Sequence, residues 1–565
     1  MKPFFYIASL LFLFVQQSFA QSPGWLWAEE ISDCANLYGQ SIARDPSGNI
    51  YITGYFYGNV DFNPGPAFNY LTSTTGSYDI FILKTDSSGN FIWAKKIGGI
   101  GEDRGNAITC DNTGNVYITG AFEGIVDFNP GADSFLLGPS SEIYIAKLSG
   151  AGNFIWAKDI GTTTLSYGQG IVTDESCNVY STGLFAGTGD FDPGAPIYNL
   201  SSPGLKGGYI SKLDSAGNFI FAKGFIGTDD IEGRDITLDA SGNIYTTGDC
   251  SGIGDFDPAP LDTFLLTTFT TNSNVFISKL DASGNFVWAK RFGGNSHGWS
   301  IVVDASENVY STGHFQFNNA DFDPGPGIYY LNSGGYSDAF ISKLNSQGNF
   351  AWAKAIGDTG EQKSFCIRLD KEGNVYTAGY YQRTVDFDPD TGIYNIQSVN
   401  NEADGYVLKY DSAANFIWAK SIGGWAYEQS NQMVLNDAGD AYVMGWFTSD
   451  TIYFDTCLVD DPSSIGGAFD VFLGKLSSQI ATDKITPLNS KKTEMNLFPN
   501  PCINCEITGV LNPNDLNVTD MLGRIVNAGF SKSANGFFIR LPQSANGIFF
   551  IQNAKTGEVV KFVKE

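Results

Sequence analysis

The sequence predicts an all-β protein in which one four-stranded antiparallel unit occurs seven times. Two markers give the same count. The aromatic residue of a W-A-K motif recurs every 63 to 67 residues, at Trp27, Trp93, Trp156, Phe221, Trp288, Trp352 and Trp418. The Tyr of a G-N-x-Y motif recurs with similar spacing, at Tyr51, Tyr117, Tyr180, Tyr245, Tyr310, Tyr376 and Tyr442. The composition agrees, because 66 Gly, 44 Phe and 27 Tyr with only 16% charged residues are typical of short aromatic strands joined by tight turns.

One unit, residues 105–160, shows the four strands. Alternating segments rich in β-branched and aromatic residues, which we call A to D, cover Ala107–Asp111, Asn115–Phe122, Glu142–Leu148 and Asn153–Ile160. Short turns of D-x-x-G-N type join A to B and C to D, because Gly and Asn accept the positive φ of a tight turn. Four antiparallel strands repeated seven times predict a seven-bladed β-propeller.

The ends of the repeat array complement each other. Residues Trp25 to Ala28 have the pattern of a lone strand D, whereas the last unit stops after its strand C, Phe469 to Leu476. We therefore expect the first strand to complete the last blade. This closure of the ring removes the strand edges that an open array would leave exposed.

The first 20 residues predict a signal peptide. Lys2 precedes the apolar run Phe4 to Val15, and the small residues Ser18 and Ala20 lie at the expected cleavage site. No later segment approaches the roughly 18 to 20 apolar residues that span a bilayer, so no transmembrane segment is expected. The propeller is then expected over residues 21–478. Residues 479–494 are rich in Ser, Thr, Lys and Asn and are expected to form a linker.

The repeat resembles a known family. The patterns G-N-x-Y-x-T-G, D-x-F-I-x-K-L-D and G-N-F-x-W-A-K are similar to the SBBP-type β-propeller repeats of exported bacterial proteins, over about residues 22–478. The resemblance implies a propeller. It carries no catalytic motif and no agreed ligand.

The last segment, residues 495–565, resembles the C-terminal sorting domain of the type IX secretion system. The similarity runs through Leu497 to Pro501, Val518 to Arg524, Ala545 to Phe550 and Lys561 to Lys564, with Cys502 as a departure after the usual N-P. It implies a small antiparallel β-sandwich recognised by the outer-membrane export machinery of Bacteroidota-like bacteria. We accordingly expect passage through the periplasm to a secreted or outer cell-surface location.

The net charge of −27 excludes nucleic acid as an expected partner, because phosphate binding depends on clustered Lys and Arg and the sequence has no basic stripe. Solubility of a large surface accounts for the excess of acid. We expect a monomer with no certain cofactor.

A repeated D-F-[DN]-P motif in the B-to-C connection supplies the candidate metal ligands. One interpretation makes each acidic pair a Ca²⁺ site; the other, which we prefer, makes Asp and Pro formers of a turn and Phe a packing residue. Because the A-to-B and C-to-D turns share one face, the B-to-C and D-to-A loops share the opposite one, which we call the loop face. The candidate residues are Asp61, Asp127, Asp190, Asp192, Asp255, Asp257, Asp321, Asp323, Asp386 and Asp388, with Asn63 and Asn129 at the second position of the first two motifs and Asp455 in the divergent seventh.

No active site is recognisable. The only histidines, His297 and His314, cannot make a His-rich zinc site, and no G-x-S-x-G elbow with matching partners is evident. We therefore predict a non-enzymatic binding or structural propeller whose loop face contacts a protein partner, a glycan or a cation. An extracellular polysaccharide hydrolase or lyase that uses carboxylates of a propeller face is the alternative, because glycosidase chemistry needs only two acids.

The repeated Trp and Tyr are interpreted as packing between blades rather than as a sugar-binding ring, because they lie inside alternating strands. The Lys of W-A-K is expected at an edge of the sheet, with its charge in solvent.

Eight cysteines in an exported chain suggest disulfides. Ring closure predicts a Cys34–Cys457 staple across the seam, and Cys502 can pair with Cys505. The remaining four, Cys110, Cys177, Cys250 and Cys366, fit equally well as small apolar residues.

Overall fold

The computed structural model divides the chain into two units, Met1–Thr482 and Asp483–Glu565. In the first unit it describes residues 23–31, 36–65, 67–139, 141–162, 166–259, 261–268, 273–388, 390, 392–454, 457–460 and 469–480, and in the second unit it describes seven strands between 496 and 564. Within these residues there is no α-helix, and the one helical turn is the 3-10 segment η1 (Val399–Asn401). None of the described helical segments is long and apolar enough to cross a membrane.

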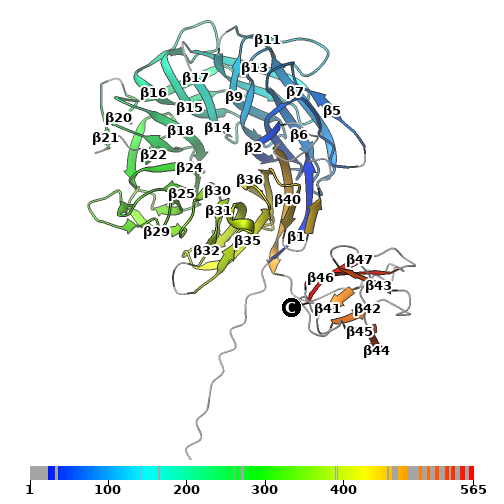
Figure 1. The fold of residues 1–565 in the computed structure, drawn as a ribbon. Coiled ribbons are helices and arrows are strands. Elements are labelled where there is room, and N and C mark those ends of the chain that lie inside the picture. Colours follow the sequence, from blue (N-terminus) through cyan, green and yellow to red (C-terminus); the bar gives the residue numbers. More distant parts are fainter. Residues whose placement is uncertain are drawn as a thin grey trace, which may run out of the picture. The chain divides into compact units, whose positions relative to one another are not determined.

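The first unit is an all-β propeller whose ladders surround a common centre (Figure 1). In each ladder A pairs with B, B with C, and C with D, all antiparallel. Repeats 1 to 3 comprise β2 (Asn36–Arg44), β3 (Ile50–Tyr57), β6 (Asp79–Thr85) and β7 (Phe91–Gly99); β8 (Arg104–Cys110), β9 (Val116–Glu123), β12 (Ser141–Leu148) and β13 (Phe154–Thr162); and β14 (Ser166–Thr173), β15 (Val179–Asp190), β16 (Asn199–Leu213) and β17 (Phe219–Gly227).

Repeats 4 to 6 follow the same order. They comprise β18 (Ile231–Leu238), β19 (Ile244–Cys250), β22 (Asn274–Leu280) and β23 (Phe286–Phe292); β24 (Ser296–Val303), β25 (Val309–Phe315), β28 (Asp338–Leu344) and β29 (Phe350–Ile356); and β30 (Gln362–Leu369), β31 (Val375–Gln382), β34 (Ala403–Tyr410) and β35 (Phe416–Gly424). The strands expected from the repeat pattern in residues 105–160 are present, with ends shifted by three residues or fewer.

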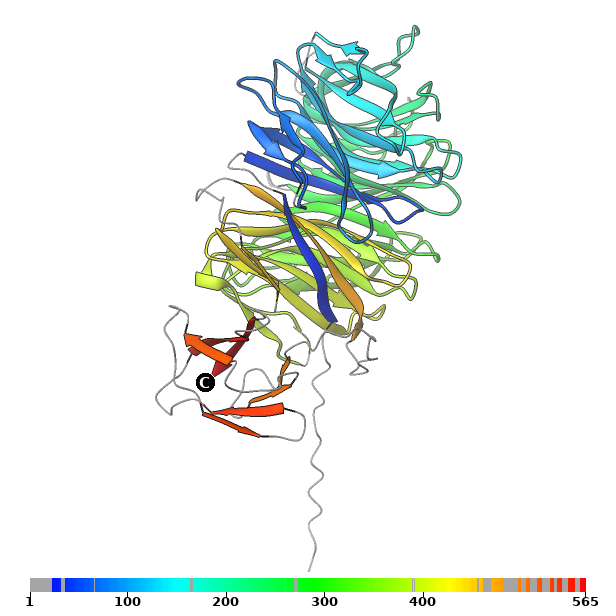
Figure 2. The same ribbon diagram turned by 90° about the vertical axis from the view of Figure 1, so that its right-hand side faces the viewer.

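Repeat 7 supplies three strands of its own, β36 (Glu428–Leu435), β37 (Ala441–Phe447) and β40 (Asp470–Ile480). The strand beside β40 is β1 (Pro23–Ile31), from the other end of the chain (Figure 2). The antiparallel register joins Pro23 to Ile480 and Ile31 to Val471. The segment Trp25 to Glu30 therefore lies against the last strand C, where the sequence pattern places it.

Short strands in the B-to-C connections extend several ladders at the rim. They are β4 (Asn59–Asp61), β5 (Tyr70–Thr72), β10 (Val126–Asp127), β11 (Leu136–Leu137), β20 (Ile253–Asp255), β21 (Leu265–Thr267), β26 (Ala320–Asp321), β27 (Tyr330–Leu331), β32 (Thr384–Asp386), β33 (Asn395–Gln397), β38 (Thr451–Phe454) and β39 (Cys457–Asp460). Strands β10, β20 and β38 also pair with strand D of the preceding repeat. The repeat pattern predicts seven separate four-stranded sheets, but these additional pairings join some of the sheets. Repeats 2 and 3, for example, share one ten-stranded sheet.

The repeated Tyr residues are the largest fully buried side chains of the propeller. Tyr51 packs in one cluster with Ile108, Ile118 and Tyr144 of the next repeat, and Tyr245 and Tyr310 occupy equivalent clusters. The prediction that these tyrosines pack between blades is confirmed.

The W-A-K aromatic residues are buried or partly buried, and most of them lie against the next repeat. Trp93 lies against Gly152 in the C-to-D turn of repeat 2, where an added Cβ would be 3.1 Å from the ring. Gly152 has a φ of 78°. In the same turn, the Gly150 carbonyl accepts a 3.3 Å hydrogen bond from the indole N–H of Trp93. The same stacking recurs for Trp27 on Gly89, Trp156 on Gly217, Phe221 on Gly284 and Trp288 on Gly348. The aromatic residue thus holds its neighbour's turn, which explains why Phe can replace Trp at position 221.

The second unit contains two antiparallel sheets. One has the order β41 (Asn496–Phe498), β42 (Cys505–Thr508), β45 (Gly536–Arg540), β44 (Gly529–Lys532), and the other has the order β43 (Leu516–Asp520), β46 (Gly547–Asn553), β47 (Val559–Lys564).

Candidate binding site at the centre of the propeller

A β-bulge lies at the same position of strand A in all seven repeats. The A-to-B register shifts between Gly39 and Ser41 in repeat 1, and between the equivalent residues elsewhere. A bulge leaves one residue unpaired and redirects its side chain. The residues at this position, which we call the bulge ring, are Gln40, Asn106, Gln169, Arg234, Trp299, Phe365 and Asn431.

The strands A lie nearest the centre of the propeller, as β2, β14, β18, β24, β30 and β36 show in Figure 1. All seven bulge-ring side chains line one cavity of about 320 Å³, which we call the central site. Tyr38, Tyr55, Gln429, Gln432 and Trp446 complete its wall. Seven positions that are far apart in sequence therefore form one surface.

Glycine on strand B makes the bulge sterically acceptable. At Gly54 an added Cβ would collide with the Tyr38 carbonyl, and at Gly120 with that of Arg104. The Gly of Y-x-T-G is thus required by the close approach of strand A. The Thr beside it, Thr53, donates a 2.8 Å hydrogen bond to the Phe81 carbonyl and also lies close to Gly105 of the next repeat.

Aromatic rings follow one another along part of the central site. From Trp299 to Tyr55, each ring centroid lies 4.9 to 6.4 Å from the next. We call this series the aromatic arc; its members in order are Trp299, Phe365, Tyr380, Tyr427, Trp446, Tyr38 and Tyr55. Tyr427 stacks on Trp446 with the ring planes 12° apart.

Ion pairs occupy the neighbouring part of the site. Arg234 Nη2 lies 2.9 Å from both Glu232 Oε2 and Asp249 Oδ2, and its guanidinium lies over the Trp299 ring. Lys206 Nζ contacts the second Glu232 oxygen at 2.6 Å. Burial would raise the pKa of Asp249, but the Arg234 charge and the His297 contact outweigh it, so this pKa lies below its ordinary value.

The two histidines belong to this cluster. Their rings stack with centroids 4.8 Å apart, His297 Nδ1 lies 3.0 Å from Asp249 Oδ2, and His314 Nδ1 accepts a 3.2 Å hydrogen bond from Trp299 Nε1. Burial, with the neighbouring His297, lowers the pKa of His314 well below its usual range, so His314 is neutral at neutral pH. In the sequence the two histidines were considered only as zinc ligands, and their place beside the centre was not predicted.

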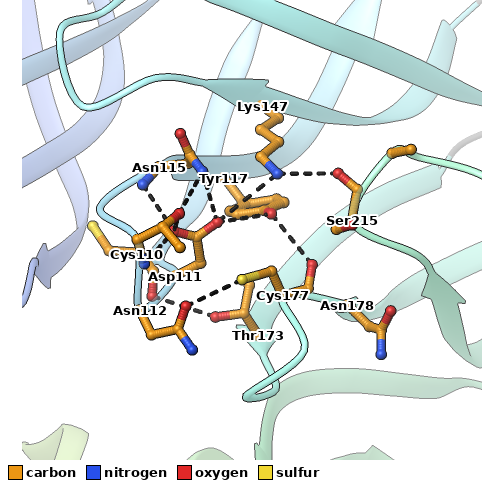
Figure 3. Close-up of polar contacts among 12 residues, drawn as sticks. Cys110, Asp111, Asn112, Asn115, Tyr117, Lys147, Thr173, Cys177, Asn178 and Ser215 are labelled. Atoms are coloured by element: carbon orange, nitrogen blue, oxygen red, sulfur yellow. Dashed lines mark hydrogen bonds and ion pairs between the residues drawn. The ribbon is translucent and has the colours of Figure 1, made fainter.

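A second polar cluster, the turn clasp, lies at the A-to-B turn of repeats 1 to 4 and 6, and Figure 3 shows it in repeat 2. In repeat 2, Asp111 accepts hydrogen bonds from the backbone N–H groups of Thr113 and Asn115 and from the Tyr117 hydroxyl at 3.1 Å. Burial would raise the Asp111 pKa, but these and other hydrogen bonds from Asn115 and Thr113 lower it overall. Lys147 Nζ lies 3.8 Å from Asp111 Oδ2, stands 4.8 Å from the Tyr117 ring centroid, and donates to the Ser215 carbonyl of the next repeat.

Equivalent Asp–Tyr–Lys contacts recur at Asp45, Asp174, Asp239 and Asp370. The D-x-x-G-N pattern predicts the turn but not its Lys partner. The signal was the Lys that recurs in D-x-F-I-x-K-L. Because the turn clasp satisfies its own charges and joins adjacent repeats, we assign it to stability.

The D-F-[DN]-P aspartates bind backbone. Asp190 Oδ1 accepts from Asp192 N at 3.1 Å and from Tyr198 N at 2.9 Å, and Asp192 Oδ1 accepts from Gly194 N at 2.8 Å. The first Asp of the motif makes the same pair of bonds in the other repeats, at Asp61, Asp127, Asp255, Asp321 and Asp386. Asp257 and Asp323 likewise accept from the backbone of Ala259 and Gly325.

These motifs lie at the rim, each in the B-to-C connection of its own repeat, and some of them contact strand D of the preceding repeat. Asp127 and Asn129 line a cavity of about 480 Å³ together with Lys95 and Lys96. Among the described residues, no three or more His, Cys, Asp or Glu side chains form a group that could hold a metal. The Ca²⁺ assignment, which includes Asp388, stays a prediction, and Asp455 lies outside the described residues. The motif's Phe residues are fully buried, as expected for packing; they are Phe62, Phe128, Phe191, Phe256, Phe322 and Phe387.

Four cysteines are free thiols: Cys110, Cys177, Cys250 and Cys366. Cys250 and Cys366 are buried in apolar clusters, where desolvation raises their thiol pKa. Cys34 and Cys502 lie outside the described residues, as do the side chains of Cys457 and Cys505. Both predicted disulfides therefore stay predictions.

Comparisons with known proteins agree with the fold. A family model described as "Beta-propeller repeat" (SBBP) matches residues 35–61. An uncharacterized WD repeat-containing protein, L264 of Acanthamoeba polyphaga mimivirus, is 24% identical over 78% of this chain, and regulatory protein FlaEY of Caulobacter vibrioides is 26% identical over 26% of it. The chain spans 38% and 14% of the length of these two relatives.

Among solved structures, a protein of unknown function from Dyadobacter fermentans matches with 9% identity and a TM-score of 0.35, covering 80% of this chain and 98% of its own. Sqt1 from Chaetomium thermophilum matches with 10% identity and a TM-score of 0.27, covering 79% of this chain and 99% of its own. The repeat match and the strand arrangement together identify the chain as a β-propeller repeat protein.

Proposed function

We propose that this chain is an exported, non-enzymatic β-propeller that binds a ligand at the central site. The observation that carries the proposal is the bulge ring. The buried Tyr recurs in all seven repeats and the turn clasp in five of them, whereas the bulge ring contains amides, aromatic residues and Arg234. A scaffold that repeats while one converging set of residues diverges is the arrangement expected of a binding surface on a rigid frame.

The proposal includes a seven-bladed ring closed by β1. Its support is that the contacts of repeat 7 with repeat 1 match those between other neighbours. Tyr442 OH donates to the Ser87 carbonyl in the C-to-D turn of repeat 1 at 3.1 Å, as Tyr51 OH does to the Gly150 carbonyl in the C-to-D turn of repeat 2 at 3.5 Å. A single cavity lined by strand A of every repeat fits the same ring.

Export is proposed from the two ends of the sequence. Residues 1–20 have the pattern of a signal peptide, and residues 495–565 resemble a type IX sorting domain. The two antiparallel sheets of the second unit are consistent with the small β-sandwich that this resemblance implies. The type IX machinery is then the partner of this module, and the mature propeller acts outside the cell.

A binding role is favoured over hydrolysis by the state of the nearby acids. Glu232 and Asp249 are held in ion pairs with Arg234, and the Asp249 pKa lies below its ordinary value. A general acid needs a proton at working pH, hence a raised pKa. Asp249 is therefore poorly suited to act as the general acid of a glycosidase.

The binding proposal is tested by melting the full mature chain with a panel of small sugars, quaternary ammonium ions, phosphates and short peptides. A ligand that raises the melting temperature of the wild type, but not of a Gln169→Ala variant, supports it. Turnover of any polysaccharide in a parallel degradation screen, or no response to any class, would contradict it. For export, removal of residues 495–565 should leave the propeller in the periplasm, whereas surface delivery of the truncated chain would reject the type IX route.

A further inference from the structure

We propose that the central site binds an uncharged carbohydrate, as one or two pyranose rings at the end of a glycan. This inference rests on the proposed function, because it names the ligand class of the same site.

The aromatic arc provides a surface for the apolar side of a sugar. Five of its rings, those of Trp299, Phe365, Trp446, Tyr38 and Tyr55, are themselves part of the cavity wall. A pyranose presents C–H groups on its faces, which carry a slight positive charge and pack against the negative face of an aromatic ring. Tyr380 and Tyr427 pack against Phe365 and Trp446 from outside the wall and so hold these rings in place.

Primary amides provide the polar part of the wall. Two of them, Gln40 and Gln169, have side chains with no hydrogen-bond partner among the described residues. One amide can donate and accept at once, which matches a hydroxyl that does the same. Asn106 and Asn431 are fixed by their bonds to the carbonyls of Gly168 and Gly39, so their amides are held in one orientation at the wall.

The charges of the site compensate one another. Arg234 is the one charged residue of the described wall, and Glu232 and Asp249 both contact it. An anionic ligand such as a phosphate would need a cation that is not already paired. A metal ion would need converging carboxylates, of which the wall has none within the described residues. An uncharged, hydroxyl-rich ligand requires neither.

The cavity volume limits the ligand. At about 320 Å³ it lies at the lower end of the range of small-ligand sites, about 300–1,000 Å³. A site enclosed by a ring of strands accepts the end of a chain more readily than the middle of a polymer. The ligand is therefore a terminal sugar or a short oligosaccharide.

The test is isothermal titration of the full mature protein with methyl glycosides of glucose, galactose, mannose and N-acetylglucosamine and with their common disaccharides. We expect at least one to bind, and Trp446→Ala and Gln169→Ala to weaken it by about tenfold or more. The matched controls are Trp425→Ala and Gln347→Ala, which change exposed residues outside the wall and should leave the affinity within about twofold. Circular dichroism of every variant establishes that it is folded.

Two results would overturn the carbohydrate assignment. If folded wild-type protein binds none of these sugars at millimolar concentration but binds tetramethylammonium or inorganic phosphate with the same sensitivity to Gln169→Ala, the site is real and the ligand class is wrong. If a sugar binds and neither wall variant weakens it, the sugar occupies another surface. Failure of the whole panel of ligand classes, in contrast, would reject the proposed function itself.

Discussion

The side-chain amide of Asn431 donates a 2.9 Å hydrogen bond to the carbonyl oxygen of Gly39, 392 residues earlier in the chain. Asn106 makes the same bond to Gly168 in the next repeat, at 2.8 Å. The contact between the last and the first repeat is thus chemically equal to a contact between consecutive repeats. Asn431→Ala and Asn106→Ala should each lower the free energy of unfolding by about 1 kcal/mol, since each loses one hydrogen bond. Urea denaturation measures both; a loss confined to Asn106→Ala would show that the seam contributes nothing to stability.

The first strand should contribute strongly to stability through Trp25. Its ring is buried against Phe454, with centroids 4.8 Å apart, whereas the adjacent Leu26 is 56% exposed. Trp25→Ala should destabilise the propeller by about 3–5 kcal/mol, the usual cost of removing a buried aromatic side chain. Leu26→Ala is the matched control and should change stability by less than about 0.5 kcal/mol. Equal melting temperatures for the two variants would contradict the pairing of β1 with β40.

The two kinds of Asp turn should differ in importance. Asp111, in an A-to-B turn, is buried and bound by Tyr117, whereas Asp86, in a C-to-D turn, is only partly buried and caps only its own turn. Asp111→Ala should cost about 1–3 kcal/mol, because it leaves the Tyr117 hydroxyl and Lys147 without their buried acceptor. Asp86→Ala should cost about 1 kcal/mol or less. Thermal denaturation of the two variants compares them directly, and a larger loss for Asp86→Ala would exclude the turn clasp as a stabilising element.

Stability should fall as the pH rises through neutrality. Burial raises the pKa of Glu428 to about 8, and that of Asp103 and Asp404 to about 7. Because each carboxyl keeps its proton to a higher pH in the folded state than in the unfolded state, their stability contribution is complete below about pH 4 and is lost as pH rises toward 8. One such group gives a slope of at most about 1.4 kcal/mol per pH unit.

Glu428→Gln should flatten part of this dependence, since Gln stays uncharged. Unfolding midpoints between pH 5 and 9 test it, with Glu372→Gln, an exposed turn residue, as the control. Parallel pH profiles for wild type and Glu428→Gln would show that Glu428 is ionised in the folded protein throughout.

The rim aspartates give a test of the cation interpretation. Asp190 accepts hydrogen bonds from two backbone N–H groups, and the side-chain oxygen of Asn can accept the same bonds. Asp190→Asn should therefore change the free energy of unfolding by less than about 0.5 kcal/mol, whereas Asp190→Ala should lower it by about 1–2 kcal/mol. Both variants are melted with and without Ca²⁺. A Ca²⁺-dependent stabilisation of the wild type that Asp190→Asn abolishes would establish the metal site instead.

The repeats made the strand order and the core residues predictable. Period, turn residues and alternation locate Tyr117 and Trp93 correctly because each such position has the same neighbours in every copy. The central site was not predictable in this way. Gln40, Trp299 and Phe365 share no residue type, and they become neighbours only through a one-residue bulge and the curvature of the ring. The D-F-[DN]-P motif, in contrast, was a candidate cation site because it is repeated, although its carboxylates accept hydrogen bonds from backbone N–H groups.

The register that places Pro23 opposite Ile480 also constrains how the protein can fold. The two partners are among the most distant of the propeller in sequence, so their pairing must close a very long loop and is expected to form late and slowly. A chain emerging from a ribosome or an export channel carries an incomplete β-edge in repeat 7 until both ends are free, and such edges recruit other strands. Joining residue 480 to residue 23 and opening the chain at an exposed turn, such as Asp281–Asn285, would convert the slowest contact into a local hairpin while every other strand neighbour stays the same.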